Sequence, residues 1–167
     1  EGLEIDPAHE EVRWGAIYRA KVTRVDAALD AVFLDLDEQN SGILYNSDVR
    51  LKDKSGKMPR GGAQAIGKTF QPGDMVNVQA KTAYLSDLHD DLIDGERKIP
   101  QMSMDITLPG RYLIYCTAGD CNKISQRVQG KKLRAQMEKM MNALEDMQGF
   151  ILRSAAADMQ TDILVRE

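Results

Sequence analysis

Alternating apolar and polar positions dominate the first half of the chain. Residues 14–44 contain two apolar runs rich in β-branched and aromatic side chains, joined by a small-residue turn and closed by Ser41-Gly42. Residues 75–80 alternate in the same way after a turn over residues 70–74. Alternation with a period of two predicts half-buried strands. The first half of the chain is therefore predicted to be a meander of short strands.

The segment between these strands has a different composition. Residues 45–50 predict a helical turn, which Asn46 or Ser47 would cap with a side-chain oxygen. Residues 51–67 are rich in Lys, Gly, Ser and Pro and predict a loop. Loops on small barrels often carry binding residues, so this segment is a candidate recognition element.

Short apolar stretches in the second half of the chain predict further strands. Residues 111–116, 124–128 and 150–154 have this pattern, and residues 108–110 predict a turn before the first of them.

Helical spacing separates these strands. Apolar residues recur every three or four positions over residues 131–147, which predicts an amphipathic helix with Gly149 as its C-cap. We interpret its apolar stripe as core rather than as a docking groove. A second helix is predicted to begin in residues 158–167. The apolar stripe of the helix predicted over residues 131–147 consists of Leu133, Met137, Met140, Met141 and Leu144.

The predicted strands and helices together indicate the α+β fold class.

Composition limits the class of protein. A chain of 167 residues, 43% of them hydrophobic, is long enough for one large domain or two small ones with a packed core. Apolar runs stay below the roughly 18 residues that a membrane span needs. The acidic opening, residues 1–6, differs from a signal peptide. We therefore expect a cytoplasmic protein with no membrane span.

Charge is distributed unevenly along the chain, whose formal net charge is −4. Residues 1–50 contain 11 acidic and 5 basic residues, whereas residues 97–140 contain 3 acidic and 9 basic residues. The basic stretch either attracts phosphate or is simply the solvated side of a helix.

The two cysteines, Cys116 and Cys121, flank a short loop. They are interpreted as free thiols, with a disulfide or a metal pair as alternatives. The two histidines, His9 and His89, are distant in sequence from the cysteines, so no zinc site is predicted. The carboxylates around His89 are interpreted as solvated rather than as a cation site. No catalytic residue is predicted, because the sequence offers no nucleophile–base pair.

Several motifs have the spacing of a known family. The patterns are G-x-I-Y-x-x-K-V-x-R-V from Gly15, A-x-F-x-D from Ala31, S-G-I-L from Ser41 and D-I-T-L-P-G-R-Y-L from Asp105. They resemble the ribonuclease E/G family. The resemblance implies a five-stranded S1-type OB-fold β-barrel inserted in a mixed α/β 5′-sensor, which is part of a ribonuclease-H-like region. The implied domains are an N-terminal strand remnant (1–13), the S1-type domain (14–103) and the 5′-sensor subdomain (104–167).

OB folds bind single strands through aromatic rings and basic side chains on an open face of the barrel. The candidates here are Tyr18, Lys21, Arg24, Phe33 and Lys81. From the residues alone, Phe33 could equally be core and Tyr18 a half-buried ring. The resemblance implies that Phe33 stacks on RNA and that Lys81 assists it.

A second set of residues is implied by the last strand, whose I-L-R-S is similar to the family's I-V-R-T. Arg153 would bind the 5′-monophosphate of RNA with its forked donors, and Ser154 would add a hydroxyl. Gly110 and Ile114 would contact the first nucleotide. No cofactor is expected in this fragment.

The resemblance implies a regulatory fragment of an endoribonuclease that cleaves single-stranded RNA in RNA processing and decay. Its catalytic aspartates and zinc-binding cysteines would lie beyond residue 167, so magnesium, zinc and homo-oligomerisation are expected for the full-length enzyme alone. The alternative is a protein-interaction module that has lost strong RNA binding. Under that alternative, Ile43 in place of a second aromatic and the acidic insertion at residues 82–101 would serve partner docking; the insertion is otherwise an elaborated hairpin.

Overall fold

Two compact units make up the protein, whose structure is a computed structural model. The first, which we name the barrel unit, comprises residues 1–53 and 59–104; the second, the C-terminal unit, comprises residues 54–58 and 105–167. The structure describes residues 12–52, 55–56, 58, 61–62, 64–81, 99–119, 122–144 and 147–166. Of the predicted strand remnant 1–13, Val12 and Arg13 are described, and Val12 is fully buried in the barrel core.

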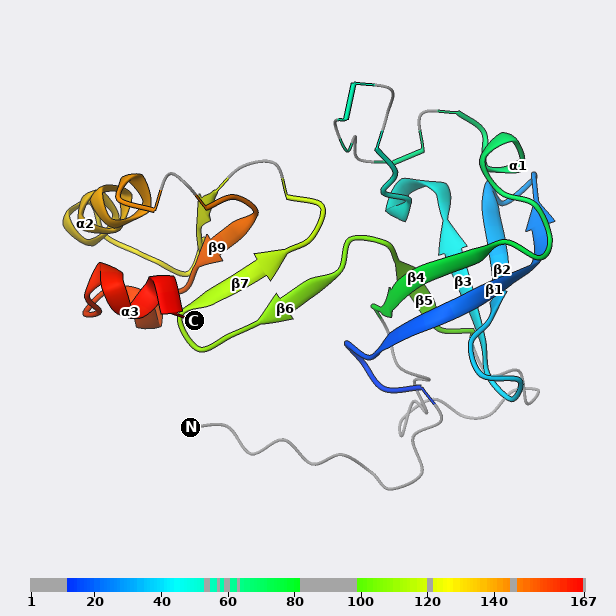
Figure 1. Cartoon of the computed structure of the whole chain (residues 1–167), viewed down its shortest axis with the longest axis horizontal. Helices are drawn as coiled ribbons and strands as arrows, with labels where there is room; N and C mark the ends of the chain where they lie inside the picture. The colour runs from blue at the N-terminus through cyan, green and yellow to red at the C-terminus, as the bar shows by residue number, and fades with distance from the viewer. Residues whose placement is uncertain are drawn as a thin grey trace. The chain divides into compact units, whose positions relative to one another are not determined.

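Five strands close into a barrel in the order β1-β2-β3-β5-β4 (Figure 1). Strands β3 and β5 are parallel, and the other four neighbouring pairs are antiparallel. A closed five-stranded barrel in an α+β chain is the OB type of architecture, and the predicted meander is confirmed. The strands are β1 (Ile17–Asp26), β2 (Ala31–Asp35), β3 (Ser41–Tyr45), β4 (Met75–Ala80) and β5 (Gln101–Ser103).

Alternate residues of each strand fill the barrel interior. Val22 of β1 lies opposite Leu34 of β2, and Leu34 lies opposite Gly42 of β3. Gly42 leaves room for the β5 side chain, since a Cβ at this position would lie 2.7 Å from Cγ of Met102. The outward-facing positions are consequently the ones available to a ligand.

The helical turn predicted after β3 is confirmed as a 3-10 helix, η1 (Asn46–Asp48), but its predicted cap and the predicted extent of the following loop are wrong. The N-cap is Tyr45, without a side-chain cap bond. The Asn46 amide instead donates to the Asp30 carboxylate (2.8 Å), a contact between distant residues that local sequence does not reveal. The predicted loop 51–67 ends early, because helix α1 (Ile66–Thr69) begins inside it. Asp30 also accepts the Ile66 N–H (3.0 Å), which anchors this helix to the barrel.

The C-terminal unit contains a four-stranded sheet in the order β6-β7-β9-β8 (Figure 1). Its strands are β6 (Thr107–Pro109), β7 (Leu113–Cys116), β8 (Lys123–Ile124) and β9 (Phe150–Leu152). Strands β8 and β9 are parallel, and the other pairs are antiparallel. The helical elements are α2 (Lys131–Asn142), η2 (Ser154–Ala156) and α3 (Thr161–Arg166).

These strands are shorter than predicted. Leu108 and Pro109 belong to β6, and the turn follows them, closed by the Gly110 N–H donating to the Leu113 carbonyl (2.8 Å). Strand β8 ends at Ile124 because the chain turns at residues 126–127. The last strand ends at Leu152, and η2 begins at Ser154.

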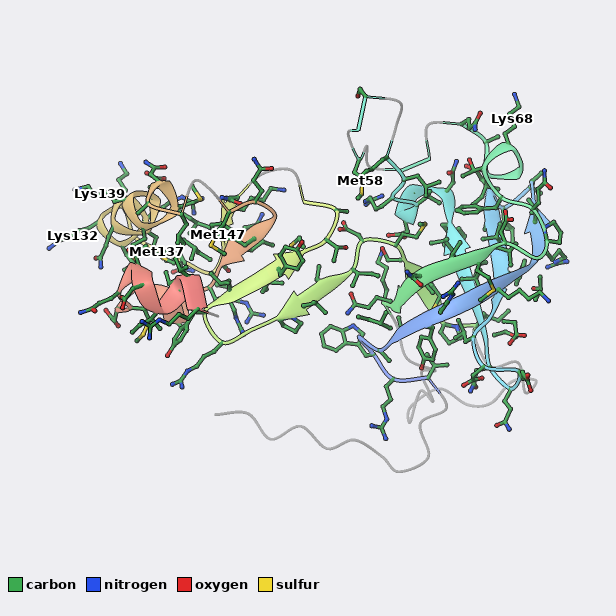
Figure 2. All side chains as sticks on the ribbon, viewed as in Figure 1. Met58, Lys68, Lys132, Met137, Lys139 and Met147 are labelled. Carbon is green, nitrogen blue, oxygen red and sulfur yellow. The ribbon has the colours of Figure 1, made fainter. Side chains whose placement is uncertain are left out.

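Helix α2 buries its methionine stripe in the core of the C-terminal unit. Met137 and Leu144 are buried, and Leu133, Met140 and Met141 pack against the same cluster, so the core interpretation is confirmed. Lys132 and Lys139 project from α2 on the side away from the sheet (Figure 2). In the described part of the chain, no helix is long and apolar enough to cross a membrane.

The prediction that Gly149 caps this helix is wrong. Helix α2 ends at Asn142 with Ala143 as its C-cap, well before the predicted end at residue 147. Gly149 has a φ of +81° and leads directly into β9. Its carbonyl accepts the Cys116 N–H (2.6 Å), so its unusual backbone conformation serves the sheet rather than the helix.

Candidate nucleic-acid interface

Phe33 lies on the outer face of the barrel. Its neighbours in β2, Val32 and Leu34, are buried in the interior, so Phe33 points outward and is half-buried there. It lies opposite Arg24 of β1 and Ile43 of β3. The guanidinium carbon of Arg24 is 4.1 Å from the centre of the Phe33 ring. One face of the candidate stacking ring is thus already covered by a cation–π contact.

A β-bulge explains why Arg24 reaches this ring. The register between β1 and β2 shifts between Val22 and Arg24, which leaves Thr23 as an extra residue. In a regular strand Arg24 would point inward like Ala20 and Val22. The bulge re-aims it to the surface, and the Thr23 hydroxyl donates to the Phe33 carbonyl at the same place (3.1 Å).

Of the five RNA-binding candidates predicted from the sequence, Arg24 and Phe33 share this face, but not all of the others do. Lys21 is exposed on the outer face, opposite Asp35 of β2 and Met75 of β4. Tyr18 lies opposite Val78, which is buried, and packs against the barrel core. The structure therefore brings Lys21 and Phe33 to one face, whereas Tyr18 belongs to the inward row.

Lys81 follows β4 and forms an ion pair. Its Nζ lies 2.9 and 3.0 Å from the two carboxylate oxygens of Asp48, and the Ser103 hydroxyl also donates to Asp48 (3.2 Å). The Asp48 side chain is 14% exposed, so the positive charge of Lys81 has a well-shielded partner. Ile43, which lies opposite Phe33 on β3, is 6% exposed and offers no open face.

The turn that leads from β2 to β3 is stabilised by Asp37. The Asn40 side-chain amide donates to Asp37 (3.0 Å), and the Asn40 N–H donates to its other oxygen (2.8 Å). The Asn40 amide, followed by the backbone donors, lowers the pKa of Asp37 below its ordinary value, with burial opposing the shift. These bonds fix the register that places Phe33 opposite Ile43.

A second candidate site lies where β9 ends. The Arg153 guanidinium donates to the Gly110 carbonyl, and the Arg153 N–H donates to the Tyr112 carbonyl (2.8 Å). Ile114 lies opposite Ile151, on the face of the sheet turned away from the buried Leu113 and Leu152. Arg153, two residues after Ile151, continues on that face.

Three of the four residues implied for 5′-phosphate binding thus come together: Gly110, Ile114 and Arg153. The fourth, Ser154, is exposed at the start of η2. Sequence reasoning missed Arg111, whose guanidinium carbon is 5.3 Å from the Tyr112 ring centre. The sequence feature that could have identified Arg111 is its position, as a basic residue directly after Gly110. Among the described residues, neither Arg111 nor Arg153 forms an ion pair.

The described part of the chain contains no group of three or more His, Cys, Asp or Glu residues that could hold a metal ion. Cys116 ends β7 and is half-buried. Cys121, His9, His89 and its acidic neighbours lie outside the described residues, as does most of the 82–101 insertion.

The fold is an OB-type barrel, with basic and aromatic side chains on its outer face, joined in one chain to a small α/β unit. Residues 107–167 match the family model described as "Ribonuclease E/G family". The protein is thus related to ribonucleases E and G, and the predicted resemblance is confirmed.

Individual relatives extend this match across the barrel. Ribonuclease G of Escherichia coli (strain K12) is 29% identical over 146 residues, which is 85% of this chain and 28% of that protein. Ribonuclease G of Haemophilus influenzae is 23% identical over 84% of this chain and 28% of that protein. Ribonuclease E of Synechocystis sp. is 23% identical over 92% of this chain and 21% of that protein. The chain therefore spans between about a fifth and little more than a quarter of the length of these relatives.

Proposed function

We propose that this chain is the RNA-binding and 5′-monophosphate-sensing portion of an endoribonuclease E/G that cleaves single-stranded RNA in RNA processing and decay. The barrel, as an S1-type domain, would hold the strand. The C-terminal unit, as a 5′-sensor within a ribonuclease-H-like region, would recognise the first nucleotide. Hydrolysis with magnesium, and assembly of subunits, would require the parts of the enzyme outside this chain.

The observation that supports this proposal most directly is the hydrogen bond from the Arg153 guanidinium to the Gly110 carbonyl. A guanidinium has five N–H donors in a planar fork, and the bond to the Gly110 carbonyl uses one side of that fork. The bond fixes the orientation of the group, and the remaining donors suit the oxygens of a terminal phosphate. The adjacent Ser154 hydroxyl is exposed and adds a further donor.

The proposed sensor predicts that Arg153→Ala removes the preference for a 5′-monophosphate. Wild-type protein should bind a short single-stranded RNA with a 5′-monophosphate about tenfold more tightly than the same RNA with a 5′-hydroxyl. That ratio corresponds to one charge-assisted hydrogen-bond set of about 1.5 kcal/mol. The variant should bind both RNAs equally. Fluorescence anisotropy with 3′-labelled RNA measures the two affinities.

A matched control separates this effect from general loss of charge. Lys139→Ala also removes one cation from the C-terminal unit, but Lys139 projects from α2 away from the sheet (Figure 2). It should keep the wild-type ratio. An Arg153→Ala protein that is folded and still prefers the monophosphate would contradict the sensor assignment.

A protein-interaction module is the second candidate function. Two features favour it: Ile43 is buried where the family has an aromatic, and Asp48 pairs with Lys81. Trp14, which is 70% exposed, would then belong to an apolar docking surface. Absence of RNA binding by the wild-type protein at low salt would favour this candidate.

A further inference from the structure

Three exposed lysines surround one exposed alanine on the outer side of helix α2. Lys131 and Lys132 lie four and three residues before Ala135, and Lys139 lies four residues after it. Residues three and four apart are neighbours on a helix surface, with Cβ atoms about 5–6 Å apart. We name Lys131, Lys132 and Lys139 the lysine triad. Because alanine ends at its methyl group, an anion can approach the helix between the three ammonium groups.

Little negative charge lies on this side of α2. Glu138 is the one acidic residue of the helix, and its carboxylate is 3.9 Å from the Arg134 guanidinium, with both side chains about half exposed. In the part of the chain that the structure describes, the ion pairs do not include a lysine of the triad. The helix therefore presents a strongly cationic surface to solvent.

The sequence at the start of α2 opposes the stability of the helix. The first turn contains Lys131 and Lys132 and no acidic residue, and the N-cap, Gly130, makes no side-chain cap bond. Cations at this end are unfavourable because they face the positive end of the helix macrodipole. Lys131 and Arg134, three residues apart, add a repulsion between like charges. Sequences break such local rules chiefly at functional sites, which favours a bound anion over a merely solvated surface.

The lysine triad is separate from the Arg153 site. Helix α2 packs through Met137 on the core cluster that contains Leu113 and Leu152, and Lys132 and Lys139 of the triad project away from the sheet (Figure 2). Arg153 lies on the other face of that sheet, with Ile114. The two sites are therefore on opposite sides of the C-terminal unit, and one phosphate cannot occupy both.

The residue types of α2 indicate which anion fits. The helix contains no aromatic residue. Single-stranded nucleic acids are bound largely through bases stacked on aromatic rings, and protein–protein interfaces are enriched in aromatic residues and depleted of lysine. Double-stranded RNA is instead recognised by its shape and by contacts to its backbone. The surface therefore suits the phosphates of base-paired RNA better than a single strand or a protein.

We propose that the lysine triad binds the phosphate backbone of a base-paired segment of RNA. The choice of RNA as the anion rests on the proposed function. Lys132 and Lys139 are seven residues apart, about 10.5 Å along the helix axis, so the triad spans more than one phosphate. Lysine is a point charge and its contacts go to the backbone, so the site does not read sequence. The chain would thus hold a folded part of the RNA apart from its single-stranded 5′ end.

A blunt-ended RNA duplex with 5′-hydroxyl ends tests this proposal, because it offers no 5′-monophosphate to Arg153 and no unpaired base to the barrel. Fluorescence anisotropy measures its binding from 50 to 300 mM salt to the wild type and to Lys131→Gln/Lys132→Gln/Lys139→Gln. Each phosphate contact on a duplex contributes about 0.9 to the slope of log affinity against log salt. The triple variant should therefore lose about 2.7 from that slope and bind about tenfold more weakly at 50 mM salt.

Three readouts separate binding from folding. Glutamine is a good helix former, and the loss of two cations from the first turn relieves the macrodipole, so the triple variant should melt no lower than the wild type. Glu138→Gln removes the nearby carboxylate and should strengthen duplex binding by about two- to fivefold. Lys68→Gln removes a cation that projects from α1 (Figure 2) and should leave the slope unchanged.

A folded triple variant with the slope and affinity of the wild type would overturn the proposal, and so would a wild-type protein that does not bind the duplex at 50 mM salt. Triad-dependent binding of a polyglutamate peptide, without binding of the duplex, would assign the surface to an acidic protein instead.

These outcomes are distinguishable from failure of the proposed function. That function is tested by the preference for a 5′-monophosphate on a single strand, which has no base-paired segment for the triad. The preference should therefore persist when Lys139 is replaced. Triad-dependent binding of the duplex without any 5′-monophosphate preference would remove the proposed sensor and leave the triad standing.

Discussion

Replacing Gly149 with alanine should destabilise the C-terminal unit by about 2–5 kcal/mol, from a strained backbone together with overpacking. The backbone φ of Gly149 is +81°, a conformation that L-residues with a Cβ rarely adopt. An added Cβ would also lie 2.7 Å from the Cys116 carbonyl oxygen and 3.0 Å from that of Gly119. Both are backbone atoms, one at the end of β7 and one just after the turn that follows it, so neither can move aside cheaply. Because Gly149 leads into β9, ordering of Arg153 should be lost as well.

Gly15→Ala provides the control for the Gly149 prediction. Gly15 has nearly the same φ, +80°, but a Cβ there would meet nothing within 4 Å. The Gly15→Ala substitution should lower the free energy of unfolding by about 1–2 kcal/mol, which is the cost of the unfavourable backbone conformation without any steric clash. Amide hydrogen exchange of β7 and β9 measures the loss of stability in the Gly149→Ala variant. Exchange of the barrel strands measures it in the Gly15→Ala variant. Equal costs in the two variants would contradict the role given to close packing around Gly149.

Replacing Phe33 with alanine should weaken binding of single-stranded RNA by roughly 5- to 150-fold, which corresponds to loss of one stacked base at about 1–3 kcal/mol. The loss includes an indirect part, because Arg24 has its guanidinium over this ring (4.1 Å) and would no longer be held flat. Fluorescence anisotropy with a 5′-hydroxyl RNA isolates the barrel from the 5′-sensor.

Phe33→Tyr is the matched control for this prediction. It retains the aromatic plane at an outward, half-buried position where a hydroxyl can reach water. Its affinity should stay within about twofold of the wild type, because base stacking tolerates any aromatic face. Wild-type affinity in a folded Phe33→Ala protein would show that RNA does not stack at this position.

The barrel strands could be predicted from the sequence because the alternation of apolar and polar residues that marks each strand lies within that strand. Strands β2 to β4 follow alternating runs whose apolar members are the buried residues, such as Val32 and Leu34. The buried methionine stripe of α2 could be predicted in the same way, because helical spacing places Met137 and Leu144 on one side of the helix, which packs into the core.

The candidate interface could be predicted only in part, because it depends on contacts between distant residues. The pairing of Lys81 with Asp48 joins residues 33 positions apart, and nothing in their local sequence signals it. Tyr18 was predicted as an RNA-binding residue because it is an aromatic residue of the barrel, whereas its position in β1 places it in the inward row, against the core. The bulge at Thr23 has no marker in the sequence, yet it decides where Arg24 points.

The sequence also predicted some helix and strand ends at the wrong residues, because contacts between distant residues decide where these elements end. The apolar spacing of α2 continues to Met147, but the helix stops at Asn142. The chain after it must reach β9 through Gly149, whose conformation is set by the approach of Cys116 and Gly119. Tertiary packing outweighed local periodicity at this end.

The most direct test of the central claim is an NMR titration of this chain with one RNA sequence carrying either a 5′-monophosphate or a 5′-hydroxyl. Both RNAs should shift the backbone amides of Lys21 and Phe33 on the barrel. The monophosphate alone should also shift those of Gly110, Arg153 and Ser154. A monophosphate RNA that shifts the barrel amides but leaves those three unchanged would contradict 5′-end recognition by the C-terminal unit.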